Sequence, residues 1–132
     1  MRIYLDTSAL VKLVVAERES QALVDFLAAH DDDGLFSAAL ARTELIRAVA
    51  PNGARAIADA RNLLNQLDIV TLTQRLLDDA GNLLPLRLHS LDAIHLTAAQ
   101  RAGDSLRAVV TYDARMCAAA ADLGISTASP PD

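Results

Sequence analysis

The sequence predicts an α/β fold in which a central parallel sheet of four to five short strands is flanked by helices on both faces. Short apolar runs alternate with helical segments along the chain, and this order favours parallel strands joined by right-handed helical crossovers. The chain has 132 residues, 52% of them hydrophobic, which is enough for one core. No repeat and no linker-like stretch divides it, so we expect a single domain over residues 1–132.

Strands are expected where β-branched, aromatic and other apolar residues form short runs between turn signals. In chain order, these runs lie at residues 2–5, 35–37, 68–72, 108–112 and 125–127. The fourth, AVVTY, has the clearest strand character, because four of its five residues are β-branched or aromatic. The tail at residues 128–132, with its two prolines, is expected to be frayed.

Helices are expected between these runs, where apolar residues recur at helical spacing. In chain order, they are predicted at residues 9–15, 20–29, 40–49, 54–67, 74–84, 91–102 and 114–123. Asp6 can cap the first helix and Ser90 the sixth, since short polar side chains accept hydrogen bonds from free amides at a helix start. Pro51 and Pro85 interrupt the helical pattern, and Gly124 can end the last helix.

Composition limits the classes of function. The net charge of −5 argues against a domain that holds nucleic acid by overall charge, although eleven arginines offer local attraction. Aromatic residues make up only 3% of the chain, too few for a base-stacking platform. We expect no membrane association, since no apolar run approaches the roughly 18 residues that span a bilayer. With no visible secretion signal and a lone cysteine, Cys117, a cytoplasmic location is expected.

Four carboxylates are the candidate functional residues. Asp6 and Asp113 follow predicted strands, and ligands of open α/β sheets bind at the carboxyl ends of strands. Asp92 lies on the same helical stripe as Leu96 and Ala99, so it needs a cation, a metal or a capping partner. Glu44 lies beside an apolar helix face and could point inward. Each acid also has a simpler explanation, namely helix capping for the three aspartates and a surface ion pair between Glu44 and Arg47.

Convergence of these acids would require a cation, because two like charges about 4 Å apart repel by roughly 4 kcal/mol at an effective dielectric of 20. All-oxygen ligands favour Mg²⁺ or Mn²⁺, whereas zinc would recruit His or Cys. His95 follows Asp92 by three positions, but a core or supporting role fits it better than ligation.

Four motifs then give a resemblance to a known family. They are LDTSALVKL at residues 5–13, TEL at 43–45, LDAIHL at 91–96 and VTYD at 110–113. Together, in this order, they resemble the motifs of the PIN-domain ribonucleases, and most closely those of the VapC toxins of bacterial toxin–antitoxin pairs. The resemblance spans essentially the whole chain, and all four acidic positions agree with it.

The resemblance implies a single PIN-like domain that hydrolyses RNA phosphodiester bonds as a Mg²⁺- or Mn²⁺-dependent endoribonuclease. It also implies a homodimer and inhibition by a cognate VapB-type antitoxin. The implied site consists of four acids and three supporting hydroxyls, namely Asp6, Glu44, Asp92 and Asp113 with Thr7, Ser8 and Thr111. We expect Asp6 and Asp92 to hold the principal metal, with Asp113 completing its shell directly or through water. Glu44 would bind a second metal or orient the attacking water.

Two alternatives come from other classes. A receiver-type signalling domain also binds Mg²⁺ at strand ends, but it needs a late lysine, and the single lysine of this chain is Lys12. A noncatalytic PIN-like module that binds RNA or protein is the other alternative, and it would have less reason to keep all four acids.

Overall fold

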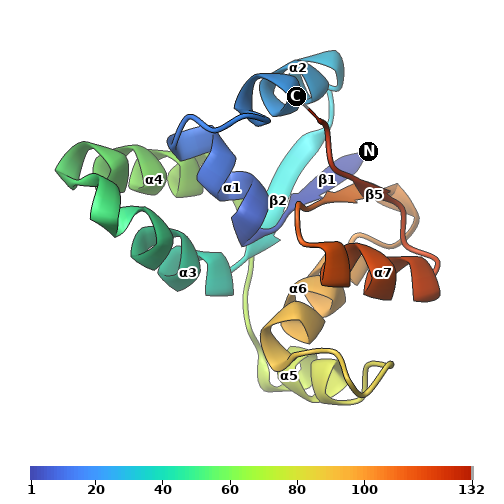
Figure 1. Ribbon diagram of the computed structural model, residues 1–132. Coiled ribbons are helices and arrows are strands. Elements are labelled where there is room, and N and C mark those ends of the chain that lie inside the picture. The colour runs from blue at the N-terminus through green and yellow to red at the C-terminus, as the bar shows by residue number, and fades with distance from the viewer. Residues whose placement is uncertain (132) are drawn as a thin grey trace.

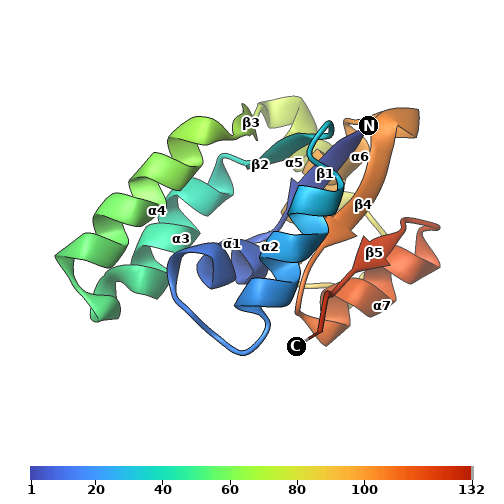
Figure 2. The same ribbon diagram turned by 90° about the horizontal axis from the view of Figure 1, so that it is seen from above.

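The computed structural model describes residues 1–131 and confirms the α/β prediction. Within these residues, five parallel strands form one sheet in the order β3-β2-β1-β4-β5, which Figure 2 shows from above. The strands are β1 (Arg2–Leu5), β2 (Gly34–Ala38), β3 (Asp68–Val70), β4 (Leu106–Val110) and β5 (Thr127–Ala128).

Seven α-helices and two short 3₁₀ helices connect these strands in the described part of the chain. The α-helices are α1 (Thr7–Val14), α2 (Ser20–Ala29), α3 (Leu40–Val49), α4 (Ala54–Gln66), α5 (Gln74–Gly81), α6 (Ser90–Gln100) and α7 (Ala114–Asp122). The 3₁₀ helices are η1 (Ala50–Asn52) and η2 (Gly103–Ser105). None of the helices within residues 1–131 has the length and apolar character needed to cross a membrane.

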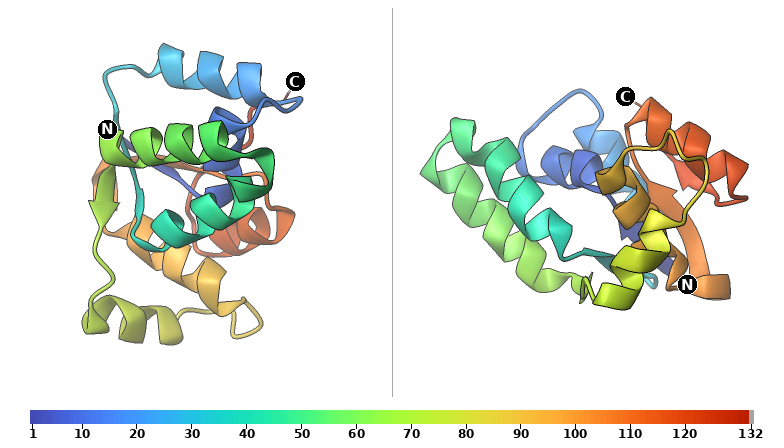
Figure 3. Two further views of the ribbon diagram at one scale, coloured as in Figure 1. Left: turned by 90° about the vertical axis from the view of Figure 1, so that its left-hand side faces the viewer. Right: turned by 90° about the horizontal axis from the view of Figure 1, so that it is seen from below.

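The helices form two layers, one on each face of the sheet (Figures 1 and 3). Helices α1 to α4 pack on one face, where Ile3 and Leu5 of β1 contribute to the core. Helices α5 to α7 pack on the other face, together with Tyr4 of β1. Neighbouring residues of β1 thus enter opposite cores, as the alternation of side chains along a strand requires when both faces are covered.

Several helix boundaries differ by one to three residues from the sequence predictions, and three of them have a clear structural reason. Helix α1 begins two residues early, at Thr7, because Asp6 itself caps it and accepts a hydrogen bond from the amide of Ala9. Helix α5 ends at Gly81 rather than at residue 84. The amides of Asn82 and Leu83 each donate to the carbonyl three residues earlier, which is the 3₁₀ pattern that often closes a helix. Ser90 is the first residue of α6 and not its cap; His89 takes the cap position without a side-chain hydrogen bond.

The last two strands are displaced from their predicted positions. Strand β4 begins at Leu106, opposite Arg2 of β1, and ends at Val110, before the predicted residue 112. Strand β5 covers Thr127–Ala128 rather than residues 125–127, because the amide of Ile125 still bonds to helix α7.

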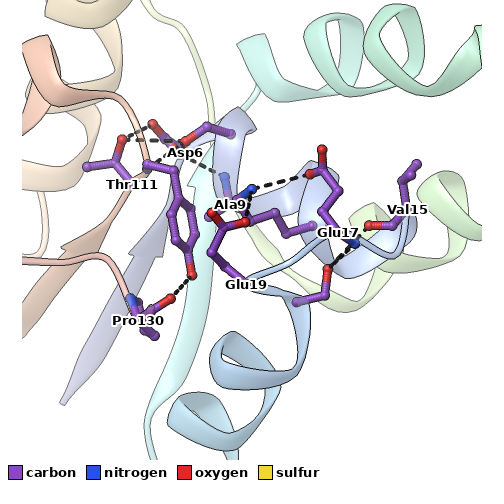
Figure 4. Close-up of polar contacts among 11 residues, drawn as sticks. Asp6, Ala9, Val15, Glu17, Glu19, Thr111 and Pro130 are labelled. Carbon is purple, nitrogen blue, oxygen red and sulfur yellow. Dashed lines mark hydrogen bonds and ion pairs between the residues drawn. The ribbon is translucent and has the colours of Figure 1, made fainter. Parts of the chain in front are cut away.

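The C-terminal segment is attached to the sheet where the sequence predicts fraying from residue 128. Ala128 belongs to β5, and the hydroxyl of Ser129 donates to the carbonyl of Thr111. The hydroxyl of Tyr112 donates to the carbonyl of Pro130 over 2.8 Å (Figure 4). These bonds hold residues 128–130 beside the end of β4; Asp132 lies outside the described residues.

The order of the strands also defines where a ligand would bind. From the central strand β1, the chain moves to β2 on one side, and it later returns to place β4 on the other side. The carboxyl ends of β1 and β4 therefore flank the point where the strand order reverses, which is the usual ligand position in open α/β sheets.

Candidate functional site

Asp6 lies at this reversal point and is almost fully buried, with 3% of its surface exposed. One carboxylate oxygen, Oδ1, accepts hydrogen bonds from the hydroxyl of Ser8 at 2.6 Å and from the amide of Ala9 at 3.0 Å. The other, Oδ2, accepts from the hydroxyl of Thr111 at 2.5 Å, and Figure 4 shows these two side chains facing each other. The predicted hydroxyls Ser8 and Thr111 therefore both contact the first acid.

The electrostatics of Asp6 set it apart from an ordinary helix cap. Burial raises the pKa of its carboxyl, and the hydrogen bonds from Ser8, Thr111 and Ala9 only partly offset that effect. No lysine or arginine forms an ion pair with it among the described residues. A cation beside this carboxylate would thus relieve an unfavourable buried charge.

Asp113 is positioned by the turn that follows β4. Its amide donates to the hydroxyl of Thr111 at 3.1 Å, and its side chain caps α7 by accepting from the amide of Arg115 at 2.9 Å. The Arg115 side chain also lies 3.9 Å from the carboxylate, which is 30% exposed. Asp113 thus performs the capping role expected from sequence, and the same placement brings it to the carboxyl edge of the sheet.

Asp92 lies in the first turn of α6, where it is partly buried. Burial is the main cause that raises the pKa of its carboxyl, and the negative charge of Asp113 raises this pKa further. This electrostatic effect shows that helix α6 and the end of β4 bring two acids close enough to disfavour the charge on one of them. Such a pair is a suitable environment for a divalent cation.

Glu44 belongs to a chain of four hydrogen-bonded side chains. Its Oε1 atom accepts from the hydroxyl of Thr7 at 2.6 Å and lies 2.7 Å from Nε2 of His95. The other ring nitrogen of His95, Nδ1, lies 2.6 Å from the hydroxyl of Tyr4. Burial alone would raise the pKa of Glu44, but the bonds from His95 and Thr7 outweigh it and hold the pKa below its usual value.

This network answers the question that sequence left open for Glu44. Its partners are Thr7 and His95, and Arg47 forms no ion pair with it within residues 1–131. The carboxylate is 24% exposed, so one edge remains accessible while the other is fixed. Sequence reasoning assigned His95 a core or supporting role, which the structure confirms, but it missed Tyr4. The available signal was that a buried tyrosine hydroxyl normally requires a hydrogen-bond partner.

The predicted residues therefore form three small groups near one edge of the sheet. Asp6 is linked to Ser8 and Thr111, Glu44 to Thr7 and His95, and Asp92 is coupled to Asp113. In the part of the chain that the structure describes, no three His, Cys, Asp or Glu side chains are already arranged as a metal-binding cluster. The chemistry of the donors nevertheless suits a hard cation, since they are carboxylate oxygens and burial raises the pKa of both Asp6 and Asp92.

Comparison with known proteins assigns this arrangement to a family. The sequence model of the PIN domain matches residues 3–122, which include all four acids. The chain belongs to the PIN-domain family. Among its relatives is Ribonuclease VapC46 of Mycobacterium tuberculosis, 47% identical over 128 residues that cover 97% of each chain. Ribonuclease VapC47 of the same species is 44% identical over 131 residues, covering 97% of this chain and 96% of the relative.

A solved structure supports the fold independently. VapC20 of Mycobacterium tuberculosis, described as a toxin that cleaves the sarcin–ricin loop, superimposes with a TM-score of 0.77. The alignment covers 97% of this chain and 99% of VapC20, at 16% sequence identity, so the likeness is one of fold. Together with the two ribonucleases, it confirms the resemblance to VapC proteins that the four sequence motifs indicated.

Proposed function

We propose that this PIN domain is a divalent-metal-dependent endoribonuclease, the toxin of a toxin–antitoxin pair. Its VapC relatives carry the name ribonuclease, and the names support RNA as the substrate. The observation that carries the proposal is the negative charge at the carboxyl edge of the sheet, which neighbouring groups compensate only in part. Burial raises the pKa of Asp6, and burial together with Asp113 raises that of Asp92. A purely structural site would have little reason to keep two carboxyl groups whose negative charge is unfavourable.

A bound cation is the simplest way to stabilise the negative charge of these two carboxylates. Asp6 and Asp92 would hold it as principal ligands, with Asp113 completing the set directly or through water. Mg²⁺ or Mn²⁺ fits a donor set made only of oxygens. When bound, such an ion would lower the pKa of water and withdraw charge from the phosphate under attack.

The protein's own groups would position the reactants. The two hydroxyls that bond Asp6, those of Ser8 and Thr111, fix the orientation of its carboxylate. Glu44 is held on one side by Thr7 and His95, which leaves its exposed edge to orient the attacking water or to bind a second metal. In hydrolysis, the water oxygen forms a bond to phosphorus, the bond from phosphorus to the leaving oxygen breaks, and a proton passes to that oxygen.

The resemblance to VapC proteins extends the proposal to partners. A cognate VapB-type antitoxin would inhibit the enzyme, and an arginine inserted among the acids would be an effective block, since it would replace the cation. We further propose that the chain acts as a single domain and a homodimer in the cytoplasm. The antitoxin and the homodimer rest on the family resemblance, whereas the single domain and the cytoplasmic location rest on the length and composition of the chain.

Cleavage of RNA by the purified protein tests the proposal. The protein, freed of any bound partner, is incubated with total cellular RNA and Mg²⁺, Mn²⁺ or EDTA, and new 5′ ends are mapped by sequencing. We expect discrete ends that require metal and are absent with Asp6→Asn. The matched control is Asp59→Asn, which alters an acid of α4 whose side chain is 44% exposed and should leave cleavage normal.

Two results would count against the nuclease. Cleavage that survives in EDTA would contradict the metal requirement. No cleavage with any metal would favour a noncatalytic PIN-like module that binds RNA or protein.

A further inference from the structure

A pocket lies directly beside Asp92, between the loop that joins α5 to α6 and the start of α7. The apolar part of its lining consists of Pro85, Leu88, Ala118 and Ala119. Its rim is polar and carries Arg87, His89 and Arg115, with Asp92 at one side. The pocket is therefore continuous with the acidic site but differs from it in charge and in lining.

The size of the pocket limits what can enter. It encloses about 160 Å³. An engineered apolar cavity of roughly 150 Å³ in another protein holds one benzene ring. The pocket is also well below the roughly 300–1,000 Å³ of sites that enclose whole drug-sized ligands. An apolar wall of this size thus suits one six-membered ring, which is the size of a pyrimidine base.

The rim supplies the positive charge that an RNA chain would need. Arg87 is 82% exposed, and its nearest acid, Asp122, is 4.0 Å away and itself exposed. Arg115 is 66% exposed, with its NH1 atom 3.2 Å from Nδ1 of His89. Both guanidinium groups therefore keep most of their hydrogen-bond donors free for an incoming anion.

We infer that this pocket is a single-nucleotide subsite for RNA, sized for a pyrimidine base. The base enters against Leu88 and Ala118, and the adjoining phosphates are bound by Arg87 and Arg115. The inference rests on the proposed ribonuclease function and deepens it, because it specifies how a chain of net charge −5 holds a polyanion next to its acids. Arg115 has the central place, since it lies between Asp113 and the pocket and can contact the phosphate nearest the acidic site.

Binding of short RNA without cleavage tests the inference. Fluorescently labelled five-nucleotide oligouridine and oligoadenosine are titrated with the full chain in EDTA, and the dissociation constant is measured at several salt concentrations. We expect oligouridine to bind more tightly than oligoadenosine. Arg87→Gln and Arg115→Gln should each weaken binding roughly tenfold. Each should also reduce the slope of log affinity against log salt by about 0.7, because one phosphate is no longer neutralised.

Two further variants separate binding of the base from binding of the phosphates. Ala118→Leu fills the pocket without changing charge, so it should weaken binding of oligouridine and leave the salt slope unchanged. Arg55→Gln is the matched control, an exposed arginine of α4 whose ion pair with Asp59 lies outside the pocket. It should leave affinity and slope at their wild-type values. Because all the substituted residues are exposed, thermal unfolding should show that the variants fold normally.

The possible results separate this inference from the proposed function. If RNA is cleaved in Mg²⁺ but the Arg87, Arg115 and Ala118 variants bind like the wild type, the subsite is overturned and the nuclease stands. If these variants weaken binding as expected but no metal supports cleavage, the subsite is supported and the nuclease fails. If the wild-type protein binds neither oligonucleotide, the subsite is overturned.

Discussion

Two substitutions at Asp6 separate what this side chain contributes to folding from what it contributes to chemistry. Asp6→Asn keeps an oxygen that can accept from the amide of Ala9 and the hydroxyl of Ser8. Asp6→Ala removes both bonds. Neither variant carries the buried charge, and in both the hydroxyl of Thr111 must find another acceptor. The comparison between the two variants therefore isolates the two local hydrogen bonds.

The expected difference follows from these hydrogen bonds. A typical intramolecular hydrogen bond contributes about 1 kcal/mol, so Asp6→Ala should unfold with a free energy about 2 kcal/mol below that of Asp6→Asn. Asn caps a helix about as well as Asp, which supports the same ordering. At roughly 4 °C per kcal/mol for a chain of this size, the melting temperatures should differ by about 8 °C. Urea denaturation followed by circular dichroism, in EDTA at pH 7, measures the difference.

The wild-type protein adds a test of the buried charge. Because burial raises the pKa of Asp6 in the folded state, the folded protein binds this proton more tightly than the unfolded chain does. The wild type should therefore lose stability relative to Asp6→Asn as the pH rises from the unfolded pKa through the raised folded one. The same denaturation series, repeated from pH 7 towards pH 4, should show the wild type gaining stability relative to the variant.

Two results would refute this reasoning. Equal unfolding free energies for Asp6→Asn and Asp6→Ala would show that the cap and the Ser8 bond contribute nothing. A wild-type advantage that grows as the pH rises would show that the fold stabilises the carboxylate charge, and would remove the argument that the charge at Asp6 is retained for a cation.

Two further predictions concern buried hydrogen bonds away from Asp6. His95→Ala should lower the free energy of unfolding by about 2–4 kcal/mol, since it opens a cavity and removes the hydrogen bond between His95 and the buried hydroxyl of Tyr4. Urea denaturation measures the loss, and an unchanged value would contradict the network. Asp33→Asn should flatten the loss of stability in acid, because the hydrogen bond from Arg107 lowers the pKa of Asp33, and that stability is lost as the pH falls through the lowered value. Melting temperatures measured across pH follow this loss of stability, with the exposed neighbour Asp32→Asn as control. Matching curves for the wild type and Asp33→Asn would contradict the prediction.

The positions of Asp6 and Asp113 at the sheet edge could be predicted because they depend on local pattern. Each acid directly follows an apolar run, and in a parallel α/β fold such positions come together at one edge. The same pattern predicted the order of strands and helices. It placed the end of β4 too late, because Thr111 and Tyr112 continue the run of β-branched and aromatic residues. In the structure, the hydroxyl of Thr111 bonds Asp6, and the amide of Tyr112 bonds Ser8.

The partner of Glu44 could not be predicted in the same way. His95 meets it only because α3 and α6 both reach this edge of the sheet, and no local spacing encodes that meeting. The arginines at the pocket rim could not be predicted for the same reason, because Arg87 comes from the loop before α6 and Arg115 comes from α7. In sequence, each of these arginines has the pattern of an ordinary surface residue.

Direct measurement of Mn²⁺ binding tests the central claim, that the acids at this edge form one metal site. Titration of the wild-type protein, followed by electron paramagnetic resonance of free Mn²⁺, should show binding that Asp92→Asn and Asp6→Asn each abolish or greatly weaken. Asp59→Asn should bind like the wild type, since this acid of α4 pairs with Arg55 on the surface. Equal Mn²⁺ binding by all four proteins, or none by the wild type, would contradict the claim.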